Sequence, residues 1–239
     1  MTILDIMPPL RTHGALEISH TPLDDLGLYR RLLRDAPSTG RCPVLLSAHA
    51  LTSVSGSADP AAASAEVARR DPGTVLAERY PAGCVYHPSC LAPFGGTFPG
   101  LARPAPGLEL LAPAEIVEAA VEEADGRGDH LLGVVAVCRP ADVPAAVGWL
   151  GTAGAWDDVA ALSAVLRSWE DRFGAVLVRM GHACLELAVA APPWERSECV
   201  AIAAEHYAFC DDTYRGNPGT LRDYANLLRG NTRWSFWWD

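Results

Sequence analysis

The chain ends in RWSFWWD, residues 233–239, and this stretch decides the fold that the sequence predicts. Alternate side chains of a strand point to opposite faces, so Trp234, Phe236 and Trp238 would share one face. Each ring can bury roughly 150–250 Å², worth about 4–6 kcal/mol at about 25 cal/mol/Å². This exceeds the cost of ordering the backbone, about 1–2 kcal/mol per residue. We therefore expect the chain end to be a strand that is packed into a sheet.

The segment before this end carries the clearest secondary-structure pattern. Residues 157–173 place apolar side chains on one helical stripe that stops at Gly174, where a C-cap glycine is typical. Two β-type runs, 175–180 and 183–190, flank Gly181-His182 and predict a hairpin. The hairpin would supply the sheet into which the C-terminal strand packs.

The first half of the chain is more irregular. We expect a helix over 22–36, a buried strand over 42–50 and a polar loop over 53–65. Residues 64–80 predict a helix broken at Pro72-Gly73. Residues 81–107 are dense in Pro and Gly, and irregular segments of this length are often functional.

Four further elements complete the predicted fold. They are an acidic helix over 112–126, a doubly buried strand over 130–138, a short helix from 140 and a helix over 195–210. Thr220 is expected to cap one more helix, with Asp223 at its third position. The sequence therefore predicts a single α+β domain, residues 1–239, with helices packed on a mixed, largely antiparallel sheet. Within it, residues 1–133 would form a variable front half and residues 134–239 a C-terminal module.

Composition excludes several classes of function. The net charge of −10 argues against nucleic-acid binding, which needs a basic face, and disfavours anionic membrane surfaces. All nineteen cationic side chains are Arg, so a Schiff-base lysine and a P-loop lysine are both excluded. The longest apolar run, 131–138, is too short to span a bilayer.

The cysteines favour a reducing compartment. There are seven, an odd number at irregular spacing, which makes a disulfide framework unexpected. The N-terminus lacks the basic and apolar regions of a signal peptide. We therefore expect a cytoplasmic protein with reduced thiols.

His206 and Cys210 lie four residues apart on a predicted helix, one turn apart on the same side. Such a pair can supply two ligands to zinc, although both residues equally fit an apolar, core-facing stripe. Cys84, His87 and Cys90 offer three more donors in the irregular segment, but they lack the second ligand pair of a usual zinc motif. The prediction is no cofactor, with zinc as the alternative.

Acidic groups gather near the end of the chain: Glu205, Asp211, Asp212 and Asp239. Carboxylates can bind a hard cation or act as acid and base, but such a group is also typical of a solvated helix end. Asp239 stands out because a buried strand would carry it inward. His182 is interpreted as a turn residue.

Several stretches together resemble the bacterial family known as domain of unknown function 4253. They are RPADVPAAVGWLG (139–151), WEDRFGA (169–175) with the hairpin after it, Pro192-Pro193, EHYAFCDD (205–212) and the terminal FWWD. The resemblance covers about Val134 to Asp239 closely and the front half loosely. It implies a compact α+β unit with an integral C-terminal strand, and it implies no activity. The loop after Cys210, CDDTYRGNPG, departs from the family pattern.

Two functions fit these observations. The first is binding of a small molecule or a protein in a cleft between loop 81–107 and the C-terminal aromatic strand, and the alternative is an enzyme of specialised metabolism that uses the same cleft. The candidate catalytic residues are His206, Cys210, Asp239 and His87. The candidate ligand-binding residues are Trp237, Trp238, Tyr207 and Phe94.

Overall fold

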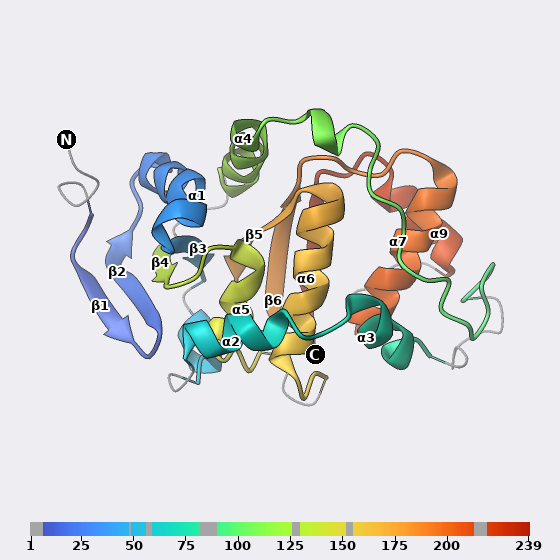
Figure 1. Ribbon diagram of the computed structural model, residues 1–239, viewed down its shortest axis with the longest axis horizontal. Helices are drawn as coiled ribbons and strands as arrows, with labels where there is room; N and C mark the ends of the chain where they lie inside the picture. The colour runs from blue at the N-terminus through green and yellow to red at the C-terminus, as the bar shows by residue number, and fades with distance from the viewer. Residues whose placement is uncertain are drawn as a thin grey trace.

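A computed structural model describes residues 7–47, 49–55, 59–81, 90–125, 130–151, 155–212 and 219–239. Its strands form one seven-stranded sheet in the order β1-β2-β4-β3-β5-β6-β7. Helices pack on both faces of this sheet (Figure 1). The predicted fold class, a single α+β domain with a mixed, largely antiparallel sheet, is confirmed.

One half of the sheet starts with a hairpin that the sequence analysis did not predict. Strands β1 (Leu10–His13) and β2 (Leu16–Pro22) pair antiparallel, and Gly14 turns between them with a φ of 59°. β2 then pairs with β4 (Leu131–Val135). Only Leu16 and Ile18 alternate as buried apolar residues in β2, so the sequence pattern of this hairpin is short.

The centre of the sheet joins the two halves of the chain. β3 (Cys42–Leu46) runs antiparallel to β4 and parallel to β5 (Ala175–Met180), and all five of its residues are buried. The pairing of β3 with β5 is the one parallel pairing among the described strands. β3 is shorter than the predicted strand 42–50, because the chain turns into the short helix η2 (Ala50–Ser53).

The C-terminal strand lies in the sheet, as predicted. β5 and β6 (Cys184–Val189) form the predicted hairpin, and β7 (Arg233–Trp237) pairs antiparallel with β6. The register places Phe236 opposite Leu185 and Trp234 opposite Leu187. β7 is therefore an edge strand whose apolar residues continue the hydrophobic face of the hairpin.

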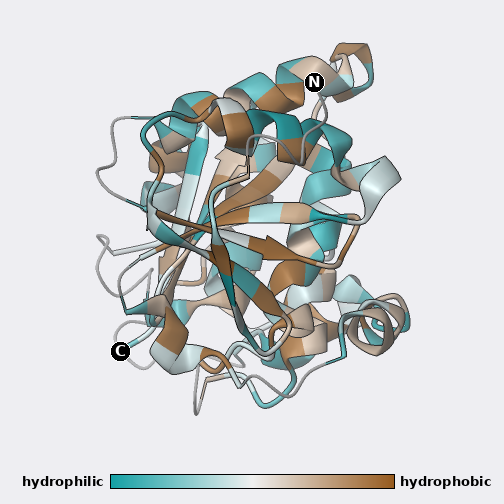
Figure 2. Ribbon diagram, turned by 90° about the vertical axis from the view of Figure 1, so that its left-hand side faces the viewer, coloured by the Kyte–Doolittle hydropathy of each residue, from teal (hydrophilic) through white to brown (hydrophobic). Residues whose placement is uncertain are grey.

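Two helices cover one face of the sheet: α1 (Gly27–Thr39) and α4 (Pro113–Ala124). The other face carries the larger core, and its helices are α2 (Pro60–Val67), α3 (Pro72–Arg79), α5 (Val143–Ala146), α6 (Val159–Phe173), α7 (Arg196–Phe209) and α9 (Leu221–Leu228). Figure 2 shows hydrophobic residues along the strands between the two helical layers, while the helices alternate hydrophobic and hydrophilic.

Local sequence signals predict several helix ends correctly and one helix start wrongly. Gly174 ends α6 in the left-handed conformation, and Thr220 caps α9 by accepting a hydrogen bond from the backbone N–H of Asp223. The predicted loop 53–65 is wrong in its second half, because α2 begins at Pro60. Asp59 caps it by accepting from the N–H of Ala61, at 2.9 Å. The remaining short elements are η3 (Leu108–Leu110) and η4 (Pro140–Asp142).

Candidate functional site

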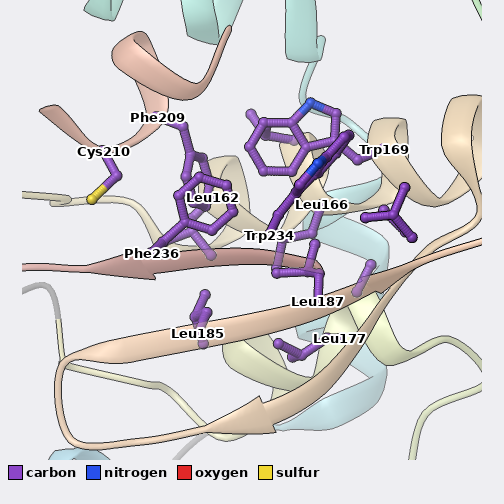
Figure 3. Close-up of a cluster of buried hydrophobic side chains, with 14 of the residues drawn as sticks. Leu162, Leu166, Trp169, Leu177, Leu185, Leu187, Phe209, Cys210, Trp234 and Phe236 are labelled. Atoms are coloured by element: carbon purple, nitrogen blue, oxygen red, sulfur yellow. The ribbon is translucent and has the colours of Figure 1, made fainter. Parts of the chain in front are cut away.

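Three aromatic side chains at the C-terminal end, two in β7 and one directly after it, lie in the core. Trp234, Phe236 and Trp238 are 2 %, 1 % and 6 % exposed. They pack against Trp169 of α6 and Phe209 of α7, and the rings of Trp169 and Phe236 are stacked with centroids 5.3 Å apart (Figure 3). Trp237, on the opposite side of the strand, is half-buried. The surface that β7 offers to the candidate cleft is therefore small.

His206 is a neutral core residue in this structure. Its ring centroid lies 4.6 Å from that of Trp234 and 4.9 Å from that of Phe236, and its side chain is 1 % exposed. Its Nδ1 is 2.9 Å from the hydroxyl of Tyr224. Burial, with a smaller contribution from the charge of Arg172, lowers the pKa of His206 to about 3. The imidazole therefore stays uncharged at physiological pH.

This burial predicts a pH-dependent stability. Between pH 6.5 and about 3 the unfolded state binds a proton at His206 that the folded state does not, so stability falls as the pH falls. Titration of this group lowers the free energy of unfolding by up to about 1.4 kcal/mol per pH unit. We expect urea denaturation of a His206→Asn variant to show a shallower decline over this window than the unaltered protein, with exposed His20→Asn as control. Parallel stability curves for all three proteins would contradict the assignment.

The structure describes two of the other predicted catalytic residues, Cys210 and Asp239, and one predicted ligand-binding residue, Tyr207. Cys210 is buried, and its Sγ donates a hydrogen bond to the backbone carbonyl of Trp237, at 2.9 Å. Tyr207 packs against Tyr80 of α3, with ring centroids 6.5 Å apart. Asp239 is exposed because β7 ends at Trp237, so the expectation that the strand carries Asp239 inward is wrong.

The cysteine-rich segment is described only in part. Cys84 and His87 lie outside the described residues. Cys90 is disulfide-bonded, which corrects the expectation that the thiols are all reduced; the other described cysteines are free. Within the described part of the chain, no three His, Cys, Asp or Glu side chains are arranged to hold a metal ion.

A buried ion pair in the core was not predicted from the sequence. Glu205 of α7 accepts two hydrogen bonds from the guanidinium of Arg172 in α6, at 2.9 and 2.6 Å, and a third from the indole of Trp169, at 2.8 Å. It also accepts from the backbone N–H of Ala102, at 2.6 Å. Glu205 is fully buried, so the interpretation of this residue as part of a solvated helix end is wrong. The pair fixes the segment around Ala102 to α6 and α7.

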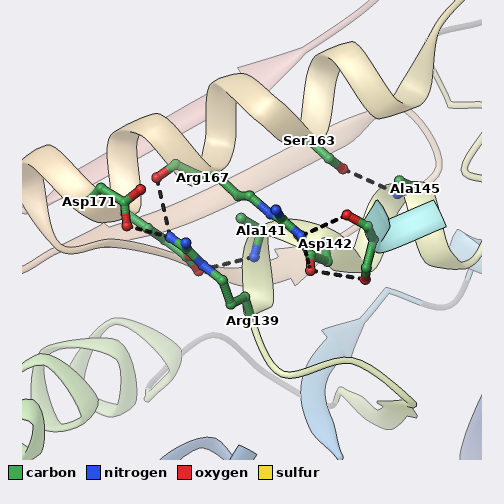
Figure 4. A network of polar contacts seen from close by, with 9 residues as sticks. Arg139, Ala141, Asp142, Ala145, Ser163, Arg167 and Asp171 are labelled. Atoms are coloured by element: carbon green, nitrogen blue, oxygen red, sulfur yellow. Dashed lines mark hydrogen bonds and ion pairs between the residues drawn. The ribbon is translucent and has the colours of Figure 1, made fainter. Parts of the chain in front are cut away.

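A second polar network ties residues 139–142 to α6 (Figure 4). Arg139 donates to Glu170, at 2.8 Å, and to Asp171, at 2.6 Å. Asp142 accepts from the guanidinium of Arg167, with a second contact at 2.7 Å. Two stretches that carry the family resemblance, RPAD and WEDRF, thus contact each other. These contacts hold the segment 139–142 against α6.

The best candidate site is a pocket of 650 Å³ at the N-terminal ends of α7 and α9. Its lining residues are Pro93, Phe94, Arg196, Ser197, Val200 and Arg222. Phe94, one of the predicted ligand-binding residues, is therefore in a pocket. The other wall is made by two helices, and the predicted wall from the C-terminal strand is not part of it.

Local structure holds the two sides of this pocket together. The backbone N–H of Leu221, the first residue of α9, donates to the carbonyl of Cys90, at 2.8 Å. The N–H of Phe94 donates to the carbonyl of Leu91, at 2.9 Å, which closes a turn beneath the ring. Leu91 and Cys90 are both buried and anchor the loop. The loop therefore presents Phe94 opposite the first turns of α7 and α9.

The charges of the pocket are positive. Arg196 and Arg222 are exposed and make no ion pair or side-chain hydrogen bond among the described residues. None of the six lining residues is acidic. The N-cap residue of α7, Glu195, makes no side-chain cap hydrogen bond. The first-turn N–H groups of α7 add positive electrostatic potential, which the carboxylate of Glu198 in the same turn partly offsets.

A second groove, of 460 Å³, lies between α3 and the start of α6. Its charged residues largely neutralise one another: Arg70, for example, pairs with Asp158, at 2.8 Å. Arg79 stacks on Trp156, 3.7 Å from the ring centroid, and donates to the carbonyl of Ala208. This groove offers a ligand fewer free polar groups than the pocket at Phe94.

Comparison with known proteins finds a similarity in the C-terminal part of the chain. The family model described as a domain of unknown function, DUF4253, matches residues 131–239. This segment resembles the DUF4253 family. Searches of the curated proteins and of the solved structures gave no match. The matched segment supplies Arg196 and Arg222 to the pocket, whereas Phe94 comes from the part of the chain before it.

None of the helices in the described ranges has both the length and the apolar character that a bilayer crossing requires.

Proposed function

We propose that the protein binds a small anionic molecule with an aromatic or apolar part in the pocket lined by Phe94, Arg196 and Arg222. The observation that carries this proposal is a concave site in which an aromatic ring lies beside two arginines that make no ion pair with any described residue. Guanidinium groups bind carboxylates and phosphates through paired, charge-assisted hydrogen bonds. The binding of a small molecule, rather than of a protein, fits a concave site of 650 Å³.

The electrostatic contrast with the rest of the molecule supports an anionic ligand. The chain has a net charge of −10, so most of its surface repels anions. No carboxylate is among the six lining residues, so the two guanidinium groups create a locally favourable place for a negative group. Ser197 adds a hydroxyl that can donate to the same group.

The remaining walls suit the other end of the ligand. Pro93, Phe94 and Val200 give an apolar surface, and Phe94 can stack on a ring. The volume falls in the range of small-molecule sites, about 300–1,000 Å³. An aromatic carboxylate or phosphate matches both the charge and the apolar walls.

Isothermal titration with phenyl phosphate tests this function. Because each charge-assisted hydrogen bond contributes about 1.5–3 kcal/mol, we expect Arg196→Gln or Arg222→Gln to weaken binding about tenfold and the double variant more. Exposed Arg11→Gln, on the far strand β1, is the matched control and should bind normally. Phenol, which lacks the anion, should bind much more weakly than phenyl phosphate.

Two results would count against the proposal. One is equal affinity of the double variant and the unaltered protein for phenyl phosphate. The other is equal weakening by Arg11→Gln, because this would indicate a general effect of net charge rather than a site.

A further inference from the structure

The wall of the pocket that carries Phe94 begins at a disulfide-bonded cysteine. Cys90 lies four residues before Phe94 in the chain and forms a disulfide bond. The other described cysteines are free, so this bond is a local feature of the pocket wall. The proposed function uses the side chains that line the pocket and assigns no role to the bond.

The backbone at Cys90 is connected to both sides of the pocket. Its carbonyl accepts a hydrogen bond from the N–H of Leu221, at 2.8 Å, and Leu221 directly precedes Arg222 in α9. The carbonyl of the next residue, Leu91, accepts from the N–H of Phe94, at 2.9 Å. The position of Cys90 therefore affects the aromatic ring and one of the two arginines together.

The segment that follows Cys90 has few other restraints. Residues 92–97 contain no helix or strand, and Phe94 and Ala92 are the partly buried residues among them. Irregular segments with exposed backbone open locally at a low cost in free energy. A covalent bond at the first turn of such a segment reduces the number of conformations that it can adopt. The disulfide bond thus helps to hold the ring of Phe94 in place for a ligand.

We propose that the disulfide bond of Cys90 is a redox-sensitive control of ligand affinity in the Phe94 pocket. This inference rests on the proposed function and adds a regulation of the same site. With the bond intact, the pocket wall is held in the arrangement that binds the ligand. After reduction, this arrangement is one of several, and the apparent affinity falls in proportion to its population.

The chemistry of the switch is thiol–disulfide exchange with a small thiol. A thiolate attacks one sulfur of the bond, and the other sulfur leaves and takes up a proton from solvent. A second thiolate then breaks the mixed disulfide. The products are two protein thiols and the disulfide of the small thiol, so the protein is reduced and the small thiol is oxidised. Because Cys90 is 2 % exposed, attack at its own sulfur is slow in the closed segment.

Isothermal titration with phenyl phosphate tests the proposal on the full chain, before and after reduction with dithiothreitol. We expect reduction to weaken binding about tenfold, which corresponds to a fall of the competent population to about one tenth. Cys90→Ser, which lacks the bond, should bind like the reduced protein with or without dithiothreitol. Cys138→Ser, which removes an exposed free cysteine, is the matched control and should respond to dithiothreitol like the unaltered protein.

Two outcomes of this titration would overturn the proposal. One is equal affinity of the oxidised and reduced proteins for phenyl phosphate. The other is a bond that dithiothreitol leaves intact in the folded chain, as measured by mass spectrometry, because such a bond cannot act as a switch.

Hydrogen exchange of the backbone amides separates this inference from the binding proposal, because it needs no ligand. Reduction should speed exchange at Phe94 and Leu221, whose N–H groups bond to the carbonyls of Leu91 and Cys90, and leave exchange in β6 unchanged. Faster exchange at these two amides without phenyl phosphate binding to either form would support the control by Cys90 and contradict the proposed ligand class. Unchanged exchange at both amides after reduction would contradict the control by Cys90.

Discussion

Deletion of residues 234–239 should leave the domain unfolded at temperatures where the full chain is folded. The deletion removes three buried rings, those of Trp234, Phe236 and Trp238, with a combined burial worth about 12–18 kcal/mol as an upper estimate. A domain is usually stable by only about 5–15 kcal/mol. The deletion also removes one of the two strands that pair with β6, so β6 becomes the edge of the sheet. Circular dichroism melting curves measure the effect.

Two smaller changes at the C-terminal end test the same prediction. Removal of exposed Asp239 alone should change the melting temperature little, and Trp234→Ala should destabilise by about 3–5 kcal/mol, as usual for a large buried side chain. An unchanged melting temperature after deletion of 234–239 would show that the packing of β7 does not support the domain.

Loss of the buried carboxylate should have the second large effect. Glu205→Ala leaves Arg172 buried without its partner and removes acceptors from Trp169 and Ala102. Breaking a buried ion pair in this way costs about 3–5 kcal/mol. Urea denaturation should show this loss, whereas Glu66→Ala, in the exposed pair with Arg69, should cost less than about 1 kcal/mol.

A double variant tests whether the stability lost in Glu205→Ala comes from the unpaired charge of Arg172 or from lost packing. Glu205→Met combined with Arg172→Met replaces both charges by apolar groups, and we expect it to be more stable than Glu205→Ala alone. Equal stability of the Glu205→Ala and Glu66→Ala variants would contradict the view that the Arg172–Glu205 pair fixes the core.

The fold could be predicted from the sequence where local and long-range signals agreed. The stripe of 157–173, the stop at Gly174 and the alternation in 233–239 each reflect one physical requirement, and the structure has α6 and β7 at these positions. The hairpin β1–β2 was not predicted, because Leu16 and Ile18 are its only fully buried apolar residues. Its place depends on β4, more than a hundred residues away.

The candidate site was less predictable, because side chains from distant segments form it. Phe94 was a candidate ligand-binding residue from the sequence and lines the pocket, whereas Arg196 and Arg222 were not among the candidates. An arginine in a sequence carries no sign of whether it will have an ion-pair partner. Both arginines lie in the first turns of helices, next to the N-terminal ends, and this placement is consistent with a site for an anion.

The histidines also show that a local sequence pattern does not determine the role of a residue. His206 shared a helical stripe with Cys210, which fits both a metal ligand and a core residue, and only its aromatic neighbours decide that it is buried. His182 was interpreted as a turn residue. Its contacts with Thr52 and Ser53 join positions about 130 residues apart, which no local pattern records.

The proposed binding function has a direct test in NMR titration with phenyl phosphate, observed at the Nε–H groups of the arginines. We predict that the signals of Arg196 and Arg222 shift together and saturate at one ligand per chain, while that of Arg11 stays in place. Small, unsaturated shifts spread evenly over all the exposed arginines would contradict a binding site at Phe94.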